Sequence, residues 1–241
     1  MDFLTSPAFW VALGQIIIID ILLGGDNAVV IALACRKLPP AQRTKGIIWG
    51  TAGAIVLRVI LIAFAMTLLN VPFLKLVGAI LLVWIGIKLL APDEDGHGNV
   101  EGSDKLFAAI KTIIVADLVM SVDNVIAIAG AAQNSGDHAM LLVVLGLLIS
   151  IPIIVWGSQL VIKLMERYPL IITAGGMLLG WIAGGMLVTD PALANPDKWQ
   201  WMFKLPQTDV VKYGAAVAGA LLVLVIGKLV AGRKPAGTGH A

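Results

Sequence analysis

The sequence predicts an all-α, polytopic membrane protein with seven transmembrane helices, arranged as two inverted three-helix repeats plus one extra C-terminal helix. Three observations predict this fold. Hydrophobic residues make up 59% of the 241 residues and charged residues only 13%, with a mean hydropathy of +0.95, whereas soluble domains carry about 25% charged residues. The apolar residues gather into stretches long enough to cross a bilayer. The first three stretches also match the next three at one constant offset of 97 positions.

Seven stretches contain the roughly 20 mainly apolar residues that a spanning helix needs. They are residues 8–34, 46–69, 72–90, 107–132, 139–162, 169–189 and 209–230. The first stretch follows no Lys or Arg and is too long for a signal peptide, so we expect it to remain as a helix. The predicted units are 1–90 (first repeat), 91–106 (acidic cytoplasmic loop), 107–189 (second repeat), 190–208 (external loop), 209–230 (seventh helix) and 231–241 (cytoplasmic tail).

The distribution of basic residues predicts the orientation. Twelve Lys and Arg fall on one set of alternate connections and four on the other, with Arg58 alone in mid-helix. Because basic residues concentrate on the cytoplasmic side, we expect the N-terminus outside and the C-terminus in the cytoplasm. We expect the chain to be surrounded by lipid, and nothing in it indicates binding to nucleic acid.

An internal repeat explains the constant offset. Pro72 matches Pro169, Gly78 matches Gly175, and Trp84 matches Trp181, all without a gap. Chance similarity among apolar helices would match Leu and Ile, but not Pro, Gly and Trp in register. Because each copy has three helices, an odd number, the two copies must cross the membrane in opposite directions. Inverted repeats of this kind place a substrate site near the midplane.

An acidic motif occupies equivalent places in the two copies. It reads Asp20-Ile-Leu-Leu-Gly-Gly-Asp26-Asn27 in the first and Asp117-Leu-Val-Met-Ser-Val-Asp123-Asn124 in the second. Ionisable groups inside a bilayer are costly and mark ion paths, proton relays or buried pairs. The alternative is that each acid is structural, as a helix cap or as a partner of Arg58. Four acids in two matched sets favour a functional site.

Helix geometry indicates how the acids combine. Asp20 and Asp26 lie about 9 Å apart along a straight helix and about 120° apart around it, too far to share one small ion. With the two copies inverted, Asp20 pairs with Asp123 and Asn124, and Asp26 and Asn27 pair with Asp117. A break at Gly24-Gly25 would bring these two clusters closer together.

The residue types predict a hard divalent cation. Carboxylate and amide oxygens suit Mg²⁺, Ca²⁺ and Mn²⁺, and none of the three His falls within a span. The predicted metal-binding residues are Asp20, Asp26, Asn27, Asp117, Asp123 and Asn124. Met120 and Arg58 are accessory candidates: Met120 would favour Mn²⁺ as a thioether ligand but more simply packs, and Arg58 either pairs permanently with one Asp or tunes the site.

The two motif copies resemble the TerC family of integral membrane proteins. The matching segments run from Asp20 through Ile31 and from Ala116 through Ala127. The resemblance implies a bacterial inner-membrane protein related to the LysE-type transporters, a group associated with Mn²⁺ export, metal supply to exported proteins and tellurite resistance. The six motif residues named above are those that the resemblance carries over.

The sequence therefore predicts a transporter that exports a divalent metal cation, with Mn²⁺ first, and not an enzyme. Repulsion between the acids would keep a proton on at least one of them, so protons are candidate counter-ions. The cation is substrate, and we expect no tightly bound cofactor. Two alternatives stay open: a membrane assembly or scaffold factor with structural buried acids, and a Ca²⁺ or Mg²⁺ carrier.

Overall fold

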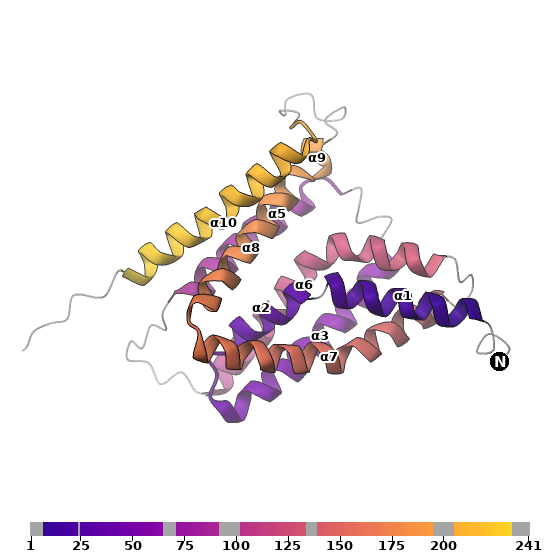
Figure 1. Cartoon of the computed structure of the whole chain (residues 1–241), viewed down its shortest axis with the longest axis horizontal. Helices are drawn as coiled ribbons and strands as arrows, with labels where there is room; N and C mark the ends of the chain where they lie inside the picture. The colour runs from indigo at the N-terminus through magenta and orange to yellow at the C-terminus, as the bar shows by residue number, and fades with distance from the viewer. Residues whose placement is uncertain are drawn as a thin grey trace, which may run out of the picture.

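The computed structural model describes residues 7–23, 25–64, 71–91, 102–133, 139–194 and 205–232, and every regular element in these ranges is an α-helix (Figure 1). The all-α class is thus confirmed. Helices occupy all seven predicted positions: α1 (Pro7–Leu23) with α2 (Gly25–Cys35), α3 (Pro40–Ala63), α5 (Leu74–Leu90), α6 (Gly102–Gln133), α7 (Ala139–Arg167), α8 (Leu170–Val188) and α10 (Asp209–Gly232). The short helix α9 (Pro191–Ala194) lies in the predicted external loop.

Several helices begin or end beyond their predicted limits. Helix α3 begins at Pro40, not at residue 46, because proline suits the first turn of a helix, where its missing N–H is not needed. Helix α6 begins at Gly102, inside the predicted loop 91–106, with Asp104 in its first turn. Helix α7 continues through Arg167. The helical turns outside the predicted limits contain polar residues. A prediction based on apolar stretches therefore leaves these turns out.

The first predicted span is broken within the acidic motif. Helix α1 ends at Leu23, α2 begins at Gly25, and their axes differ by 46°. Glycine lowers helix stability, and Gly25 is the first residue of α2. Helix α6 carries the second motif copy without interruption. The two copies therefore differ in local structure.

The described residues contain four or five candidate spans, compared with the seven that the sequence predicts. Within the described residues, α3, α7, α8 and α10 are long and apolar enough to cross a membrane, and the bent pair α1–α2 would make a fifth span. Helix α5 has 17 residues, short of the roughly 20 that a bilayer requires. The side chains of residues 125–133 of α6 lie outside the described part of the chain. Seven spans and inverted topology accordingly stay predictions.

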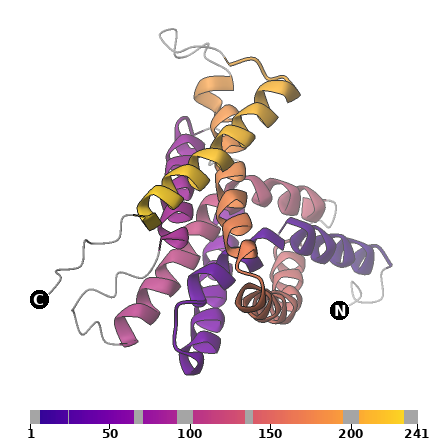
Figure 2. The same ribbon diagram turned by 60° about the vertical axis from the view of Figure 1, so that its left-hand side comes forward.

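Two views show how the helices group. Helices α5, α8 and α10 run side by side, while α1, α3, α6 and α7 form a second group (Figures 1 and 2). Helix α1 packs on α7, and α3 packs on α6. In the predicted repeat α1 corresponds to α6 and α3 corresponds to α7. The contact between α1 and α7 is therefore equivalent to the contact between α6 and α3. The third helices of the two copies, α5 and α8, also pack on each other, as expected for related halves that face each other.

Small residues bring α8 and α10 into backbone contact. A Cβ atom on Gly180 or Gly184 would collide with the α10 backbone at Gly219 or Ala215. Lipid tails are as apolar as Leu, so membrane helices associate through such close packing and not through exclusion of water. Helix α10, which has no counterpart in the repeats, is fixed in this way against α8.

The apolar core consists of two clusters. One is formed by α1, the second half of α3 and the first half of α7, with Ile16, Leu61 and Leu147 at its centre. The other is formed mainly by α2, α5, α6 and α8, with Leu33 and Leu82 among its fully buried members. Helices α3 and α7 contribute to both clusters. Where these helices pass from one cluster to the other, they carry buried polar residues.

Candidate functional site

A layer of polar side chains lies between the two apolar clusters. We call it the polar layer, and it consists of Asp20, Asp26, Asn27, Arg58, Asp117, Ser121 and Ser150. All except Asp26 are buried. Five different helices contribute: α1, α2, α3, α6 and α7. Buried polar groups in an apolar surrounding are costly unless they bond to one another, so their concentration in one layer is a specific feature of this fold.

Arg58 joins the two copies of the acidic motif. Its Nη1 donates to Asp20 Oδ1 and its Nη2 donates to Asp117 Oδ1, both as buried ion pairs. Its Nε donates to Ser121 Oγ at 3.0 Å. A planar guanidinium with several fixed donors is suited to holding two carboxylates at once, which a lysine ammonium would hold less specifically. Asp20 and Asp117 are thus brought together through one side chain.

Two serines complete the bonding of these acids. Ser150 Oγ on α7 donates to Asp20 Oδ2, and Ser121 Oγ donates to Asp117 Oδ2 at 3.0 Å, one turn along α6. Each buried carboxylate therefore accepts from Arg58 with one oxygen and from a serine with the other. Neither serine was among the predicted site residues, although Ser121 lies inside the second copy of the acidic motif. The signal for Ser150 was a small hydroxyl residue in mid-span, a common type that is hard to interpret without its neighbours.

Asp26 lies at the start of α2 and is only partly buried. Its Oδ1 accepts from the backbone N–H of Asn27 at 2.8 Å. A carboxylate at a helix N-terminus interacts favourably with the positive end of the helix dipole. Asp26 also lies within electrostatic range of Arg58 and Asp117. Asp26 therefore belongs to the same charged group as Asp20, although the two acids lie on helices, α2 and α1, whose axes differ in direction.

Asn27 is the least satisfied member of the layer. It is 4% exposed, and within the described residues neither its Nδ2 nor its Oδ1 has a hydrogen-bond partner. Asn27 and Asp117 line one cavity of about 10 Å³ together with Val30, Ile31 and Ile113. A space of this size is about one water-sized probe. A buried amide without a partner calls for an explanation, such as a bound ion or water.

The predicted pairing of the acids is partly observed. Asn27 and Asp117, from opposite motif copies, share a cavity as the inverted repeat predicts. The prediction of two separate clusters is wrong, because Arg58 bonds both Asp20 and Asp117. The side chain of Asp123 lies outside the described residues, and Asn124 is partly buried on α6. Met120 is buried in the larger apolar cluster, in agreement with the packing interpretation.

The charges of the polar layer do not balance. Three carboxylates, Asp20, Asp26 and Asp117, face one guanidinium, Arg58, which leaves a formal excess of two negative charges when all are ionised. In the described part of the chain, no three Asp, Glu, His or Cys side chains converge closely enough to hold a metal ion. The two nearest carboxylates are held by Arg58 instead. A cation entering the layer would therefore have to compete with the guanidinium.

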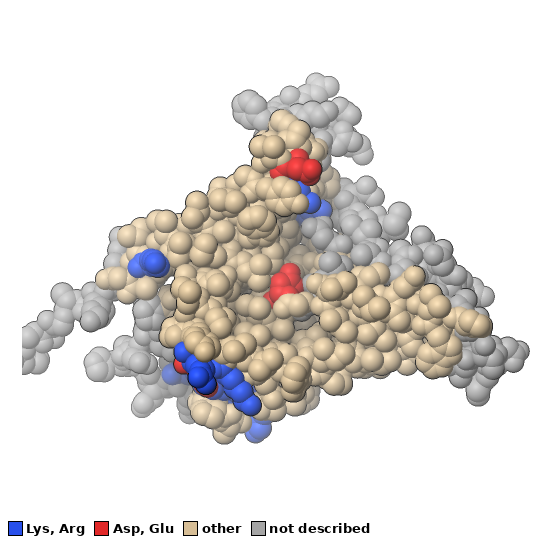
Figure 3. Space-filling model, in the orientation of Figure 1, with Lys and Arg blue, Asp and Glu red and all other residues tan. Residues whose placement is uncertain are grey.

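Acidic side-chain atoms reach the surface in the middle of one face of the molecule. In Figure 3 acidic side-chain atoms are visible at the bottom of a depression in the middle of the face, surrounded by uncharged surface. Basic side chains gather elsewhere, with the largest visible group at one end of the helices. Negatively charged atoms are thus exposed in the middle of this face. Charged groups within a membrane are energetically costly, so such a position indicates a functional site.

Comparison with known sequences places the chain in a family. A model of the TerC family, described as integral membrane proteins, matches residues 5–235, which include the whole polar layer. The chain belongs to the TerC family. This confirms the resemblance noted from the two motifs and establishes an integral membrane protein.

Relatives of this TerC protein include membrane proteins from two well-separated bacteria. The chain is 46% identical to the uncharacterized membrane protein YjbE of Bacillus subtilis over 186 residues, covering 77% of this chain and 83% of the relative. It is 28% identical to the UPF0053 inner membrane protein YgdQ of Escherichia coli K12 over 189 residues, covering 69% of this chain and 75% of the relative. No solved structure matches the chain.

Proposed function

We propose that this TerC protein is a transporter that exports a divalent metal cation, with Mn²⁺ as the first candidate, through the polar layer. The observation that carries the proposal is the cavity lined by Asn27 and Asp117. It brings an amide and a carboxylate from opposite repeats to one point, and the Asn27 amide has no hydrogen-bond partner among the described residues. Oxygen ligands of these two kinds suit Mg²⁺, Ca²⁺ and Mn²⁺.

The charge of the layer supports a divalent ion. The excess of two negative charges over Arg58 equals the charge that one such ion brings. Asp26, which is next to Asn27 at the start of α2, supplies a carboxylate that is only partly buried. The cation would enter past Asp26 and bind between Asn27 and Asp117. The proposed role of all six motif residues as ligands includes Asp123 and Asn124 from the second copy.

Arg58 gives the proposed site an internal competitor. While the guanidinium holds Asp20 and Asp117, a metal ion reaches Asp117 only by displacing one arm of Arg58 or by using oxygen atoms that Arg58 does not hold. A permanent countercharge lowers the cost of keeping acids inside the bilayer and weakens cation binding, which favours release. Proton exchange is part of the proposal, since carboxylates that lose a cation must gain another positive charge.

The orientation remains as proposed from the basic residues, with the N-terminus outside and the C-terminus in the cytoplasm of a bacterial inner membrane. Relatives named as inner membrane proteins support the compartment. We propose no enzymatic activity and no tightly bound cofactor.

A cellular experiment tests this function. Cells lacking the protein should accumulate Mn²⁺ under Mn²⁺ stress, as measured by elemental analysis, and the wild-type chain should restore the normal content. Asp117→Asn should fail to restore it while reaching the membrane in normal amounts. Asp209→Asn, at an exposed acid in the first turn of α10, is the matched control and should restore export. Full rescue by Asp117→Asn would exclude the polar layer as the path.

A second candidate is a membrane assembly factor whose acids are structural. The observations that favour it are the Arg58 pairs with Asp20 and Asp117 and the position of Asp26 at a helix start. This alternative leaves the bare Asn27 amide and the charge excess unexplained. It predicts that no metal ion accumulates when the protein is absent, and that Asn27 can be replaced by an apolar residue without loss of function.

A further inference from the structure

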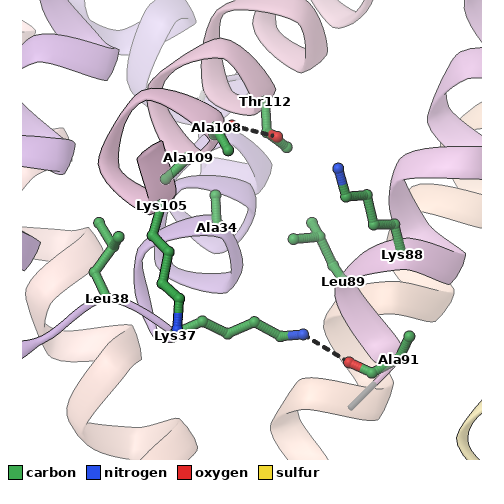
Figure 4. A pocket seen from close by; sticks show the side chains of 10 residues that line it. All are labelled: Ala34, Lys37, Leu38, Lys88, Leu89, Ala91, Lys105, Ala108, Ala109 and Thr112. Atoms are coloured by element: carbon green, nitrogen blue, oxygen red, sulfur yellow. Dashed lines mark hydrogen bonds between the residues drawn. The ribbon is translucent and has the colours of Figure 1, made fainter. Parts of the chain in front are cut away.

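A second charged pocket lies far from the polar layer, at one end of the helices. It has a volume of about 320 Å³ and is bounded by the connection between α2 and α3, the end of α5 and the beginning of α6. Three lysines line it, namely Lys37, Lys88 and Lys105, and among the described residues no acidic side chain does. Figure 4 shows that each lysine comes from a different one of these three elements.

The three lysines of the pocket differ in their contacts and in their exposure. Lys37 reaches across to the end of α5, where its Nζ donates to the carbonyl oxygen of Ala91 at 2.7 Å (Figure 4). This contact fixes the connection after α2 to α5. Lys88 lies with its ammonium 5.0 Å from the centre of the Trp84 ring, and its side chain is exposed. Lys105 is exposed on the first turns of α6.

The rest of the lining is apolar and small. Apart from the lysines and Thr112, the walls are made of Leu38, Leu89 and four alanines. The pocket thus has a cationic part and an apolar part. It lies where helices end, on the side that the basic residues predict to be cytoplasmic. A ligand with an anionic group joined to a hydrocarbon chain fits both parts, whereas a nucleotide or a free metabolite would leave the apolar wall exposed to water.

We propose that this pocket binds the phosphate of an anionic phospholipid headgroup, such as phosphatidylglycerol, with the first part of its acyl chain against Leu38 and Leu89. Basic pockets between membrane helices on the cytoplasmic side are suited to such headgroups, and each ammonium close to an anionic lipid surface contributes about a fivefold factor in affinity. The bound lipid would join α2, α5 and α6 at the end of the bundle. This inference is independent of the transported ion.

Lipid retention by the purified full-length protein tests the proposal. Native mass spectrometry in detergent would measure phosphatidylglycerol bound to the wild type and to the double variant Lys88→Gln/Lys105→Gln. Removal of two ammonium groups should weaken binding roughly thirtyfold. Lys111→Gln/Lys163→Gln is the matched control, because these two lysines are exposed on α6 and α7 and do not line the pocket. It should retain the lipid.

Three further arms decide between explanations. Lys88→Arg/Lys105→Arg keeps the charge and should bind as the wild type does, which excludes misfolding as the cause of a loss. Phosphatidylcholine, which has the same phosphate but no net charge, should bind at least tenfold more weakly. Thermal unfolding with inorganic phosphate alone should show no stabilisation that depends on these lysines. Equal loss in both double variants, equal binding of the two lipids, or a lysine-dependent effect of phosphate alone would overturn the proposal.

Discussion

Asn27 and Asp117 lie on the wall of the same cavity of about 10 Å³, although 89 intervening residues separate them in the sequence. They belong to different copies of the acidic motif, on α2 and α6. A buried amide without a hydrogen-bond partner lowers the free energy of unfolding by about 1–3 kcal/mol. A residue with only a structural role would have no reason to carry such an amide. The stability and the transport activity of variants at Asn27 should therefore change in opposite directions.

Replacement of Asn27 by Leu, which branches at Cγ as Asn does but has no polar atoms, tests this opposition. Because Leu carries no amide to leave unsatisfied, the Asn27→Leu variant should keep the free energy of unfolding of the wild type or raise it by about 1 kcal/mol. Its cation flux should fall at least tenfold. Thermal unfolding in detergent and Mn²⁺ flux in vesicles measure the two effects. Asn27→Asp should keep part of the flux. A destabilised Asn27→Leu variant with normal flux would show that Asn27 is structural.

Removal of Arg58 should be strongly destabilising. Arg58→Met leaves the buried carboxylates of Asp20 and Asp117 without their countercharge, and breaking a buried ion pair from one side costs about 3–5 kcal/mol. Adding Asp117→Asn to Arg58→Met should recover about 1–3 kcal/mol, since contacting residues are energetically coupled. Denaturation of the single and double variants measures this coupling. Strictly additive effects would mean that the pair contributes nothing to the folded state.

The contact between α8 and α10 gives a stability prediction with an internal control. Gly184→Ala should destabilise the protein by about 1–3 kcal/mol, because the new methyl group would collide with the backbone of Ala215. The neighbouring Gly185 has open space where a Cβ would lie. Gly185→Ala should therefore leave the unfolding temperature unchanged or raise it slightly. Similar effects at both positions would contradict the close packing of α8 on α10.

Asp190 fixes the start of α5 from another part of the chain. Its carboxylate, fully buried, accepts backbone N–H bonds from Phe73 at 3.0 Å, Leu76 at 3.0 Å and Ala192 at 2.8 Å. Asp190→Ala should reduce the free energy of unfolding by at least about 2 kcal/mol, because a carboxylate that caps a helix makes charge-assisted bonds.

Asp209→Ala serves as the control for Asp190→Ala. Asp209 is exposed in the first turn of α10, so its removal should cost less than about 1 kcal/mol. Chemical denaturation compares the two. Equal losses at the two positions would show that the bonds of Asp190 are exchanged for water without a penalty.

The sequence predicted the positions of the helices because apolar length and proline placement determine them locally. The sequence predicted one helix over residues 8–34 and named Gly24-Gly25 as the place where a break would bring the acids together, and α1 ends there at Leu23. The ends of α3, α6 and α7 were set too far inward, because polar turns continue a helix beyond its apolar part. Helix α5 begins only at Leu74, after Phe73 in the left-handed conformation, so it is slightly shorter than the predicted span 72–90.

The arrangement of the polar layer was only partly predictable. The predicted inversion placed Asn27 level with Asp117, and these two residues line one cavity. It could not show that Arg58 reaches both Asp20 and Asp117, since Arg58 has Val155 at its repeat position and follows no symmetry. Nor could it identify Ser150 as the partner of Asp20, which depends on how α7 packs against α1. Such contacts are set by tertiary packing and leave no pattern in the sequence.

Flux through the purified protein in vesicles tests the central claim most directly. Full-length wild type and Asp117→Asn would be reconstituted in parallel, and Mn²⁺ entry would be followed with and without a pH gradient, with Ca²⁺ and Mg²⁺ as competitors. We expect the wild type to carry Mn²⁺, the pH gradient to change the rate, and Asp117→Asn to reduce the flux at least tenfold with normal insertion. No flux of any of the three ions through the wild type, or equal flux through the variant, would contradict transport through the polar layer.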